Sequence, residues 1–276
     1  MKTQFKFIAL LFTAIIFISI TANAQWIKPS GNTISETRNL DSFHSIHSSS
    51  SADIMISQGN TQKVVVESDA NLVPHIKTYV SDGVLKIEIK KNFKNIDELT
   101  IYITVPDLNK ISVSGSGDIK VNKFKSTELI VKISGSGDFY GDLDLKKLQY
   151  KVSGSGDGNI SGVTGELEIG ISGSGDIKAT GLRLSNCSAK VNGSGDMNLS
   201  GKTENLSIAI SGSGDIHAYG LEAVNVTAKI AGSGDIEITA IENISASIAG
   251  SGDVYYKGNP NQSKVSASGS GDLIRR

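Results

Sequence analysis

The residues with the most regular spacing in this sequence are aspartates. Each one ends a Gly-Ser-Gly-Asp segment, which recurs nine times at separations of 20, 19, 19, 20, 19, 20, 18 and 19 residues. A carboxylate at one fixed place in every repeat can accept hydrogen bonds from backbone N–H groups or bind a cation. The nine aspartates are Asp118, Asp138, Asp157, Asp176, Asp196, Asp215, Asp235, Asp253 and Asp272.

We favour the first of these two uses. Glycine reaches positive φ without a Cβ clash, so Gly-Ser-Gly predicts a tight turn, in which the following Asp accepts N–H groups as in an Asx turn. The alternative is a ladder of Ca²⁺ sites on these carboxylates, because charges stacked about 4.8 Å apart in water repel by about 0.9 kcal/mol. Calcium-binding nonapeptide rolls use two facing turns, whereas each repeat here has one such Asp. We therefore predict no resident metal or cofactor, with Ca²⁺ as the alternative.

The other groups that could do chemistry do not converge. From Asp118 onward no repeat gathers acids with Arg and Lys, so the sequence predicts no catalytic residues and a protein that is not an enzyme. Cys187 occupies an apolar strand position, which predicts a buried structural thiol. Exposed aromatic rings would favour sugar binding, and Tyr255 is the ring that we expect to face outward. The four histidines lack metal-ligand spacing, and we expect the best pair among them to lie at the surface: His44 and His47, with His75 and His217 elsewhere.

A second regular row consists of amides. It lies eight to ten residues after the aspartates of the C-terminal repeats, where side-chain amides can hydrogen-bond from one repeat to the next. A degenerate early copy of the aspartate segment is also visible at Ser50-Ser51-Ala52-Asp53. The amide row consists of Asn186, Asn205, Asn225 and Asn243.

The elements that must position these rows are β-strands. Apolar residues alternate with polar ones on both sides of each Asp, as in Ile177/Ala179 and Leu206/Ile208/Ile210. This period of two is typical of strands and gives strand, turn, strand, turn in about 19 residues. That length is too short for a propeller blade and suits one coil of a β-helix. The fold class is therefore all-β, a parallel β-helix or solenoid with one coil per repeat over residues 111–276.

The start of the chain indicates export. Lys2 and Lys6, an apolar run and Ala22-Asn23-Ala24 fit a secretory signal peptide over residues 1–24, cleaved before Gln25. We expect no transmembrane segment after cleavage and a flexible leader over residues 25–37. The mature net charge falls from −1 to −3 because two lysines and no acids are lost, which argues against nucleic-acid binding.

Residues 38–110 lack the repeat but are rich in strands, and we interpret them as irregular coils that cap the rod and are continuous with it. Their motifs resemble a known family. Ala52-Asp53-Ile54, Gly83-Val84-Leu85 and Val105-Pro106-Asp107-Leu108, followed by serial Ser-Gly-Ser-Gly-Asp, are similar to the "putative auto-transporter adhesin, head GIN domain" family of exported Gram-negative proteins. The resemblance covers about residues 38–276. It implies a β-helical fold in the cell envelope and supplies no catalytic residues.

Three classes of function are open to such a rod. The first is a non-catalytic, adhesin-like binding protein whose partner is an unknown protein or glycan, located in the periplasm, on the outer surface or in the medium. The second is a structural envelope element that self-associates. The third, which we favour least, is a polysaccharide-acting enzyme, because its catalytic cluster would have to break the repeat.

Overall fold

The structure is a computed structural model that describes residues 26–94 and 98–276. The signal peptide predicted over residues 1–24 lies outside this part of the chain. Nearly every element is a strand, and the exception is a 3-10 helix of three residues, η1 (Val73–His75). None of the helices in the described ranges is long and apolar enough to cross a membrane. The all-β solenoid predicted from the repeat is confirmed.

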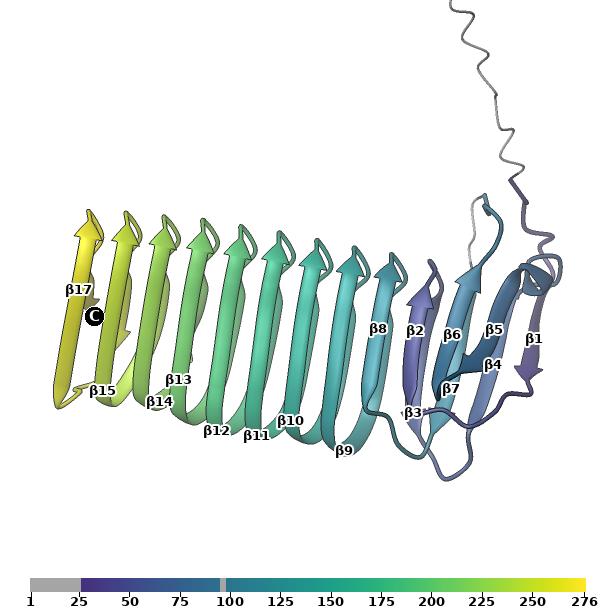
Figure 1. The fold of residues 1–276 in the computed structure, drawn as a ribbon, viewed down its shortest axis with the longest axis horizontal. Helices are drawn as coiled ribbons and strands as arrows, with labels where there is room; N and C mark the ends of the chain where they lie inside the picture. The colour runs from purple at the N-terminus through teal and green to yellow at the C-terminus, as the bar shows by residue number, and fades with distance from the viewer. Residues whose placement is uncertain (1–25, 95–97) are drawn as a thin grey trace, which may run out of the picture.

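The rod is built around seven long strands, one between each two successive Gly-Ser-Gly-Asp segments from Asp118 to Asp253. Each strand has 15 to 17 residues and pairs in parallel with the same strand of the next repeat. Figure 1 shows them side by side along the long axis, with the chain turning back at one end of every coil. The strands are β9 (Ile119–Gly135), β10 (Phe139–Gly154), β11 (Gly158–Gly173), β12 (Ile177–Gly193), β13 (Met197–Gly212), β14 (Ile216–Gly232) and β15 (Ile236–Gly250).

The prediction of two turns per repeat was wrong in one respect. The Gly-Ser-Gly-Asp segment is a true turn between strands, but the second reversal is a bend within one continuous strand. Ladder pairing continues around this bend, with shifts in register such as the one between Ala179 and Leu182. The bend is tightened where the chain has positive φ, as at Gly181 (φ 67°). A glycine can relieve curvature there without ending the ladder, which is why the pattern resembled a turn.

The alternation predicted from the sequence places the apolar side chains inside. Ile177, Ala179, Leu206, Ile208 and Ile210 are all buried, with exposed fractions of at most 2%. Each coil packs its inward residues against those of the coils before and after it, so burial is shared along the rod. A single coil would expose both of its faces, which is why an array is required.

The coil that adjoins β8 and β9 includes the degenerate repeat. β2 (Ser45–Ser49) pairs with β8 (Lys110–Gly115), and β3 (Asp53–Gln58) pairs with the start of β9. Between β2 and β3 lies Ser50-Ser51-Ala52, and Asp53 Oδ1 accepts the backbone N–H of Asp118 at 2.9 Å. The early copy predicted from four residues of sequence is therefore confirmed as a corner of the same kind.

The N-terminal coils belong to the same sheet as the repeats, but they do not follow one another in chain order. β6 (Val84–Ile89) and β7 (Leu99–Val105) pair in parallel with β2 and β3 on the side away from β8 and β9. The coil formed by β2 and β3 thus lies between the layer of β6 and β7 on one side and the repeats, beginning with β8 and β9, on the other. Alternation within a strand specifies its buried face but not its neighbour, so this insertion could not be predicted.

Antiparallel strands end the rod on the N-terminal side. β1 (Thr33–Arg38) pairs with β4 (Lys63–Asp69), β4 pairs with β7, and β5 (Ile76–Ser81) pairs with β6. Part of the expected flexible leader is therefore wrong, because residues 33–38 form an edge strand (Figure 1). Five of the six residues in β1 are exposed and polar residues predominate, which suits an edge that must not recruit other strands.

The last coil consists of three short strands. β16 (Val254–Lys257) and β17 (Gln262–Gly269) both pair with β15, and β18 (Leu273–Arg275) pairs with β16. Every residue of β17 is exposed, including Val265 at a position that is inward in earlier coils. The core is therefore complete from the N-terminal cap to β15.

The inward assignment generates a stability prediction. Ile208→Asp would place an unpaired charge in the dry interior of β13 and should lower the free energy of unfolding by about 3–5 kcal/mol. Lys178→Ala changes an exposed outward side chain on β12 and should alter it by less than about 0.5 kcal/mol. Urea unfolding monitored by circular dichroism measures both. Equal losses for the two variants would contradict the inward assignment.

Candidate functional site: a groove beside an aspartate ladder

Two glycines allow each corner to lie directly on the one before it. The first glycine has positive φ in most copies, as at Gly173 (φ 147°). The second does not, but a Cβ at Gly175 would collide with the carbonyl oxygen of Gly156 in the preceding coil. The serine N–H between them continues the stack, since Ser174 donates to the carbonyl of Gly154 at 2.9 Å. Close approach therefore explains the second glycine, where we had expected positive φ.

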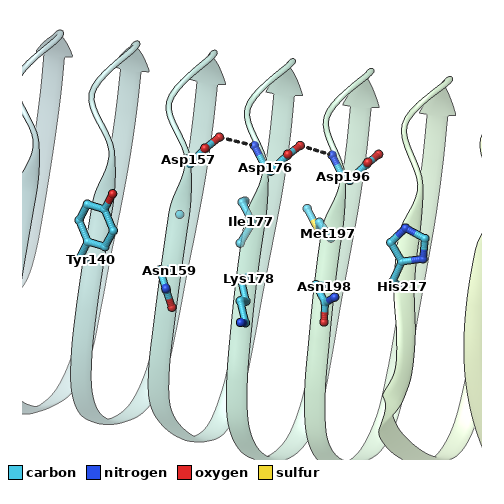
Figure 2. A pocket seen from close by; sticks show the side chains of 11 residues that line it. Tyr140, Asp157, Asn159, Asp176, Ile177, Lys178, Asp196, Met197, Asn198 and His217 are labelled. Atoms are coloured by element: carbon cyan, nitrogen blue, oxygen red, sulfur yellow. Dashed lines mark hydrogen bonds between the residues drawn. The ribbon is translucent and has the colours of Figure 1, made fainter.

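The aspartate of each corner binds the backbone of the following corner. The main-chain N–H of Asp176 donates to Oδ1 of Asp157 at 2.8 Å, and that of Asp196 donates to Oδ1 of Asp176 at 2.8 Å (Figure 2). The same bond, at 2.7 to 2.9 Å, joins every successive pair from Asp53 to Asp272. We had expected an Asx turn within one corner, and the structure shows a bond between coils instead.

This ladder gives the stacked carboxylates a structural role. Each charge is stabilised by an N–H group that points directly at it, and bonds of this kind are about twice as strong as neutral ones. In the part of the chain that the structure describes, no group of three or more His, Cys, Asp or Glu residues is arranged to hold a metal ion. The Ca²⁺ ladder stays an alternative prediction, which the melting experiment below tests.

A groove of about 370 Å³ runs along the outer surface beside this ladder. It crosses the coils of β10 to β14, and its floor is formed by the backbone at the start of those strands. One side carries Asp157, Asp176 and Asp196, each with Oδ1 bound to the next coil. The outward residues two positions after the aspartates line the rest of it, in one row (Figure 2): Tyr140, Asn159, Lys178, Asn198 and His217.

Tyr140 is the wall at one end of the groove. Its side chain is 40% exposed, and its hydroxyl donates to Oδ2 of Asp138 at 3.2 Å. The Asp138 charge and this hydrogen bond raise the pKa of the phenol, so it stays neutral. The ammonium group of Lys120 on the preceding coil lies 5.8 Å from the ring centroid. These contacts hold the ring in place at the edge of the groove.

His217 is the wall at the other end. Its Nδ1 lies 2.8 Å from Oε2 of Glu237, and this hydrogen bond is the main reason why the pKa of His217 is raised, against a smaller opposing effect of burial. Between the two walls the row contains two short amides and Lys178. The Lys178 ammonium group has no ion-pair partner among residues 26–94 and 98–276. The centre of the groove thus offers an unpaired cation between donors and acceptors.

The floor of the groove lacks an inward side chain at Gly158. Other coils have a large inward residue at this place, such as Phe139 or Ile177, and here Tyr150 of the preceding coil fills the space from below. A Cβ at Gly158 would lie 2.7 Å from the Tyr150 hydroxyl. That hydroxyl is buried without a hydrogen-bond partner among the described residues, and burial raises the pKa of Tyr150. Gly158 and Tyr150 are therefore matched in size across two coils.

The amide row predicted from the sequence is confirmed as a ladder, which lies at a bend within the long strands, away from the Gly-Ser-Gly-Asp corners. The Asn205 amide donates to Asn186 at 3.3 Å, Asn225 donates to Asn205 at 3.1 Å, and Asn243 donates to Asn225 at 2.6 Å. A hollow of about 510 Å³ lies beside it. Three of its four charged residues are already paired, as in Lys147 with Glu166 and Glu168 with Lys151, and it contains no aromatic ring. The groove beside the aspartates is the better candidate site.

The remaining chemical candidates have structural surroundings. Cys187 is buried, as predicted, and burial raises the pKa of its thiol to about 12. His44 contacts Ser45 and Asn109, while burial and the Lys86 charge lower the pKa of His47. These two histidines form no metal cluster in the described ranges.

The groove was missed in the sequence because the wrong tyrosine was singled out. Tyr255 is only partly exposed, since Arg276 lies over its ring at 4.6 Å from the centroid. Tyr140 occupies the equivalent place in an earlier coil and has a more open surface. Writing the repeats under one another and following the column two residues after each Asp would have placed Tyr140 beside Asn159 and Lys178.

The architecture is a parallel β-solenoid with a surface groove. The family model described as "putative auto-transporter adhesin, head GIN domain" matches residues 42–200 and 186–260. The chain belongs to this family, which confirms the resemblance found in its motifs. No curated protein matches the chain.

Solved bacterial structures share the fold. A "putative lipid binding protein" from Parabacteroides distasonis ATCC 8503 is 25% identical with a TM-score of 0.69, over 91% of this chain and 100% of that one. A "putative adhesin" from Bacteroides fragilis NCTC 9343 is also 25% identical, with a TM-score of 0.50 over the same shares. A "putative adhesin" from Parabacteroides merdae ATCC 43184 is 23% identical with a TM-score of 0.71, over 92% and 100%.

The close approach of corners predicts that glycine matters more than charge. Gly175→Val would drive a side chain into the backbone of the preceding coil and should destabilise the rod by more than about 3 kcal/mol. Gly170→Val, on the strand β11 that leads into this corner, is the matched control, because a Cβ there meets nothing closer than 3.9 Å. It should be neutral or slightly stabilising, since valine favours strands. Urea unfolding compares the two.

Urea unfolding also tests the role of the aspartate charge. Asp176→Asn keeps an oxygen that accepts the Asp196 N–H, so it should change the free energy of unfolding by at most about 1 kcal/mol. EDTA should leave the melting temperature of the wild-type chain unchanged. A rise in melting temperature with Ca²⁺ that several Asp→Asn changes abolish would favour the cation ladder by mass action.

The His217–Glu237 contact predicts a local pH dependence. Because the pKa of His217 is raised above 6.5 in the folded chain, the contact is fully present below pH 6.5 and is lost as pH rises through the folded-state pKa. Both side chains are about one-third or more exposed, so its contribution is under about 1 kcal/mol. NMR titration of the imidazole protons should show a lower His217 pKa in Glu237→Gln. The His47 titration is the internal control and should not move.

Proposed function

We propose that this chain is an exported, non-catalytic, adhesin-like binding protein of the cell envelope, and that its ligand binds in the groove between Tyr140 and His217. The observation that supports this most directly is a surface groove with an aromatic ring at one end and, along one side, a row of aspartates that hydrogen bonds hold in place. Family membership supports the adhesin-like class. The signal-peptide pattern of residues 1–24 supports export.

The arrangement of carboxylates favours binding over hydrolysis. Glycoside hydrolysis uses two carboxyl groups on opposite sides of the scissile bond, one of which must be protonated. Asp157, Asp176 and Asp196 instead lie in one line on one side of the groove. Each is also bound to the backbone of the next coil and is not free to move toward a substrate. A fixed row of acceptors suits recognition.

Lipid binding inside the rod is a weaker candidate. One solved relative carries the description "putative lipid binding protein". A lipid tail would need an apolar cavity, but the interior of the coils is occupied by side chains such as Phe124, Phe139 and Tyr150, all 0% exposed. The surface groove is open and partly polar. We therefore place ligand binding on the surface.

The proposal predicts that the groove mediates attachment to cells. Beads coated with the mature chain should bind intact bacterial or host cells, and Tyr140→Ala should reduce the number bound several-fold because it removes one wall of the groove. Tyr102→Ala is the matched control, since Tyr102 is 43% exposed on β7, outside the groove. Protease treatment of intact producing cells should degrade the protein if it faces outward. Attachment unaffected by Tyr140→Ala, or absent altogether, would contradict the proposed function.

A further inference from the structure

We propose that the groove binds a neutral oligosaccharide that lies across the coils, with one sugar ring against Tyr140. This inference rests on the proposed function and specifies the ligand of the same site. It draws on the charge of the groove, the chemistry of its hydrogen-bonding groups, its aromatic wall and its length.

The charged residues of the groove disfavour both anionic ligands and strongly basic peptides. Three aspartates line it against one lysine, so phosphates, nucleic acids and acidic glycans meet net repulsion. A strongly basic peptide is also disfavoured, because the unpaired Lys178 ammonium group lies in the middle of the row. The wall at His217 carries its own counter-ion, Glu237. The ligand that avoids both conflicts is neutral.

The hydrogen-bonding groups suit hydroxyl groups. Asn159 and Asn198, on either side of Lys178, each offer an amide donor and an acceptor to solvent. The aspartates use Oδ1 in the ladder, which leaves Oδ2 as a fixed acceptor on the same side of the groove. A sugar hydroxyl donates one hydrogen bond and accepts others, so neighbouring hydroxyls can bind a carboxylate and an amide or ammonium group together.

The aromatic wall suits the apolar face of a sugar ring. Tyr140 is anchored at its hydroxyl by Asp138, and Lys120 lies over the ring from the preceding coil. The groove extends from the ring over the following coils. An aromatic body with a fixed polar tip provides contact area at low entropic cost, because few rotatable bonds remain to be ordered.

The length of the groove favours a chain over a single sugar. Tyr140 and His217 are separated by four coil steps, which at about 4.8 Å each give roughly 19 Å. Similar polar groups recur at each step, and the ligand that matches such a lining has hydroxyls that repeat along its length. The aspartate ladder holds these binding groups at a constant spacing before the ligand binds. Only the oligosaccharide therefore loses conformational entropy on binding.

The test is an array of immobilised neutral oligosaccharides of different linkage, together with acidic oligosaccharides and an oligo-arginine peptide. Multivalent display compensates for weak binding at a single site. The mature chain should bind one or more neutral oligosaccharides, and Tyr140→Ala should weaken that binding about tenfold or more. Tyr102→Ala should bind like the wild type. Urea unfolding of both variants should confirm that each is folded.

A second variant probes the polar groups separately. Asp176→Asn keeps the ladder acceptor and replaces the free carboxylate oxygen by an amide nitrogen, so it should weaken oligosaccharide binding several-fold with little loss of stability. Lys178→Ala should also weaken it. Both changes lie on β12 or its corner and leave Tyr140 in place. Oligosaccharide binding that none of these three groove variants alters would overturn the proposed site.

The remaining outcomes separate this inference from the proposed function. If the chain binds only acidic oligosaccharides or only oligo-arginine, the neutral-ligand inference is wrong. If it binds no probe while Tyr140→Ala still abolishes attachment to cells, the ligand is another molecule, and the proposed function stands without the inference. If attachment to cells is also absent, the proposed function itself fails.

Discussion

The close contact between one Gly-Ser-Gly-Asp corner and the next is the constraint on which the rest of the rod depends. Without a Cβ on Gly175, its backbone can lie against the carbonyl of Gly156, so successive corners stack at the spacing of a parallel ladder. Once the corners are at that spacing, the strands on both faces of the coil are brought into register. The alternating side chains then meet like residues above and below them, and burial becomes continuous along the array.

The hydrogen bonds of the aspartates allow charged side chains to stack at this close spacing. A column of ten carboxylates, from Asp53 to Asp272, would repel if each were left to solvent alone. Each Oδ1 except the last instead accepts the N–H group of the next corner, so a charge and an otherwise unpaired donor satisfy each other. The corner therefore couples neighbouring coils through the side chain as well as through the backbone. That coupling is the reason why we expect the acceptor oxygen to matter more to stability than the charge.

Repetition made most of the fold predictable, and the order of the strands was missed where repetition ends. The period of about 19 residues predicted the coil, the inward faces and the amide ladder, because the same pattern of apolar and polar residues recurs in each repeat. Even the degenerate corner at Asp53 could be recognised. The order of β6 and β7 relative to β2 could not, because the pairing of distant strands is not written in local alternation. The strand over residues 33–38 was missed for the same reason, since the residues it pairs with on β4 are 26 (Arg38 with Val64) to 36 (Thr33 with Asp69) positions away in sequence.

The candidate site follows a different rule from the core. Inward columns must contain residues of matched volume, as Tyr150 and Gly158 show, whereas outward columns have no such restriction. The column two residues after the aspartates has rings at Tyr140 and His217, and two short amides and the flexible Lys178 between them. The hollow is thus made by side-chain size on a flat ladder, and the backbone does not need to depart from the repeat. Binding specificity in such a rod can therefore change by substitution in one outward column, while the corner contacts and the core remain as they are.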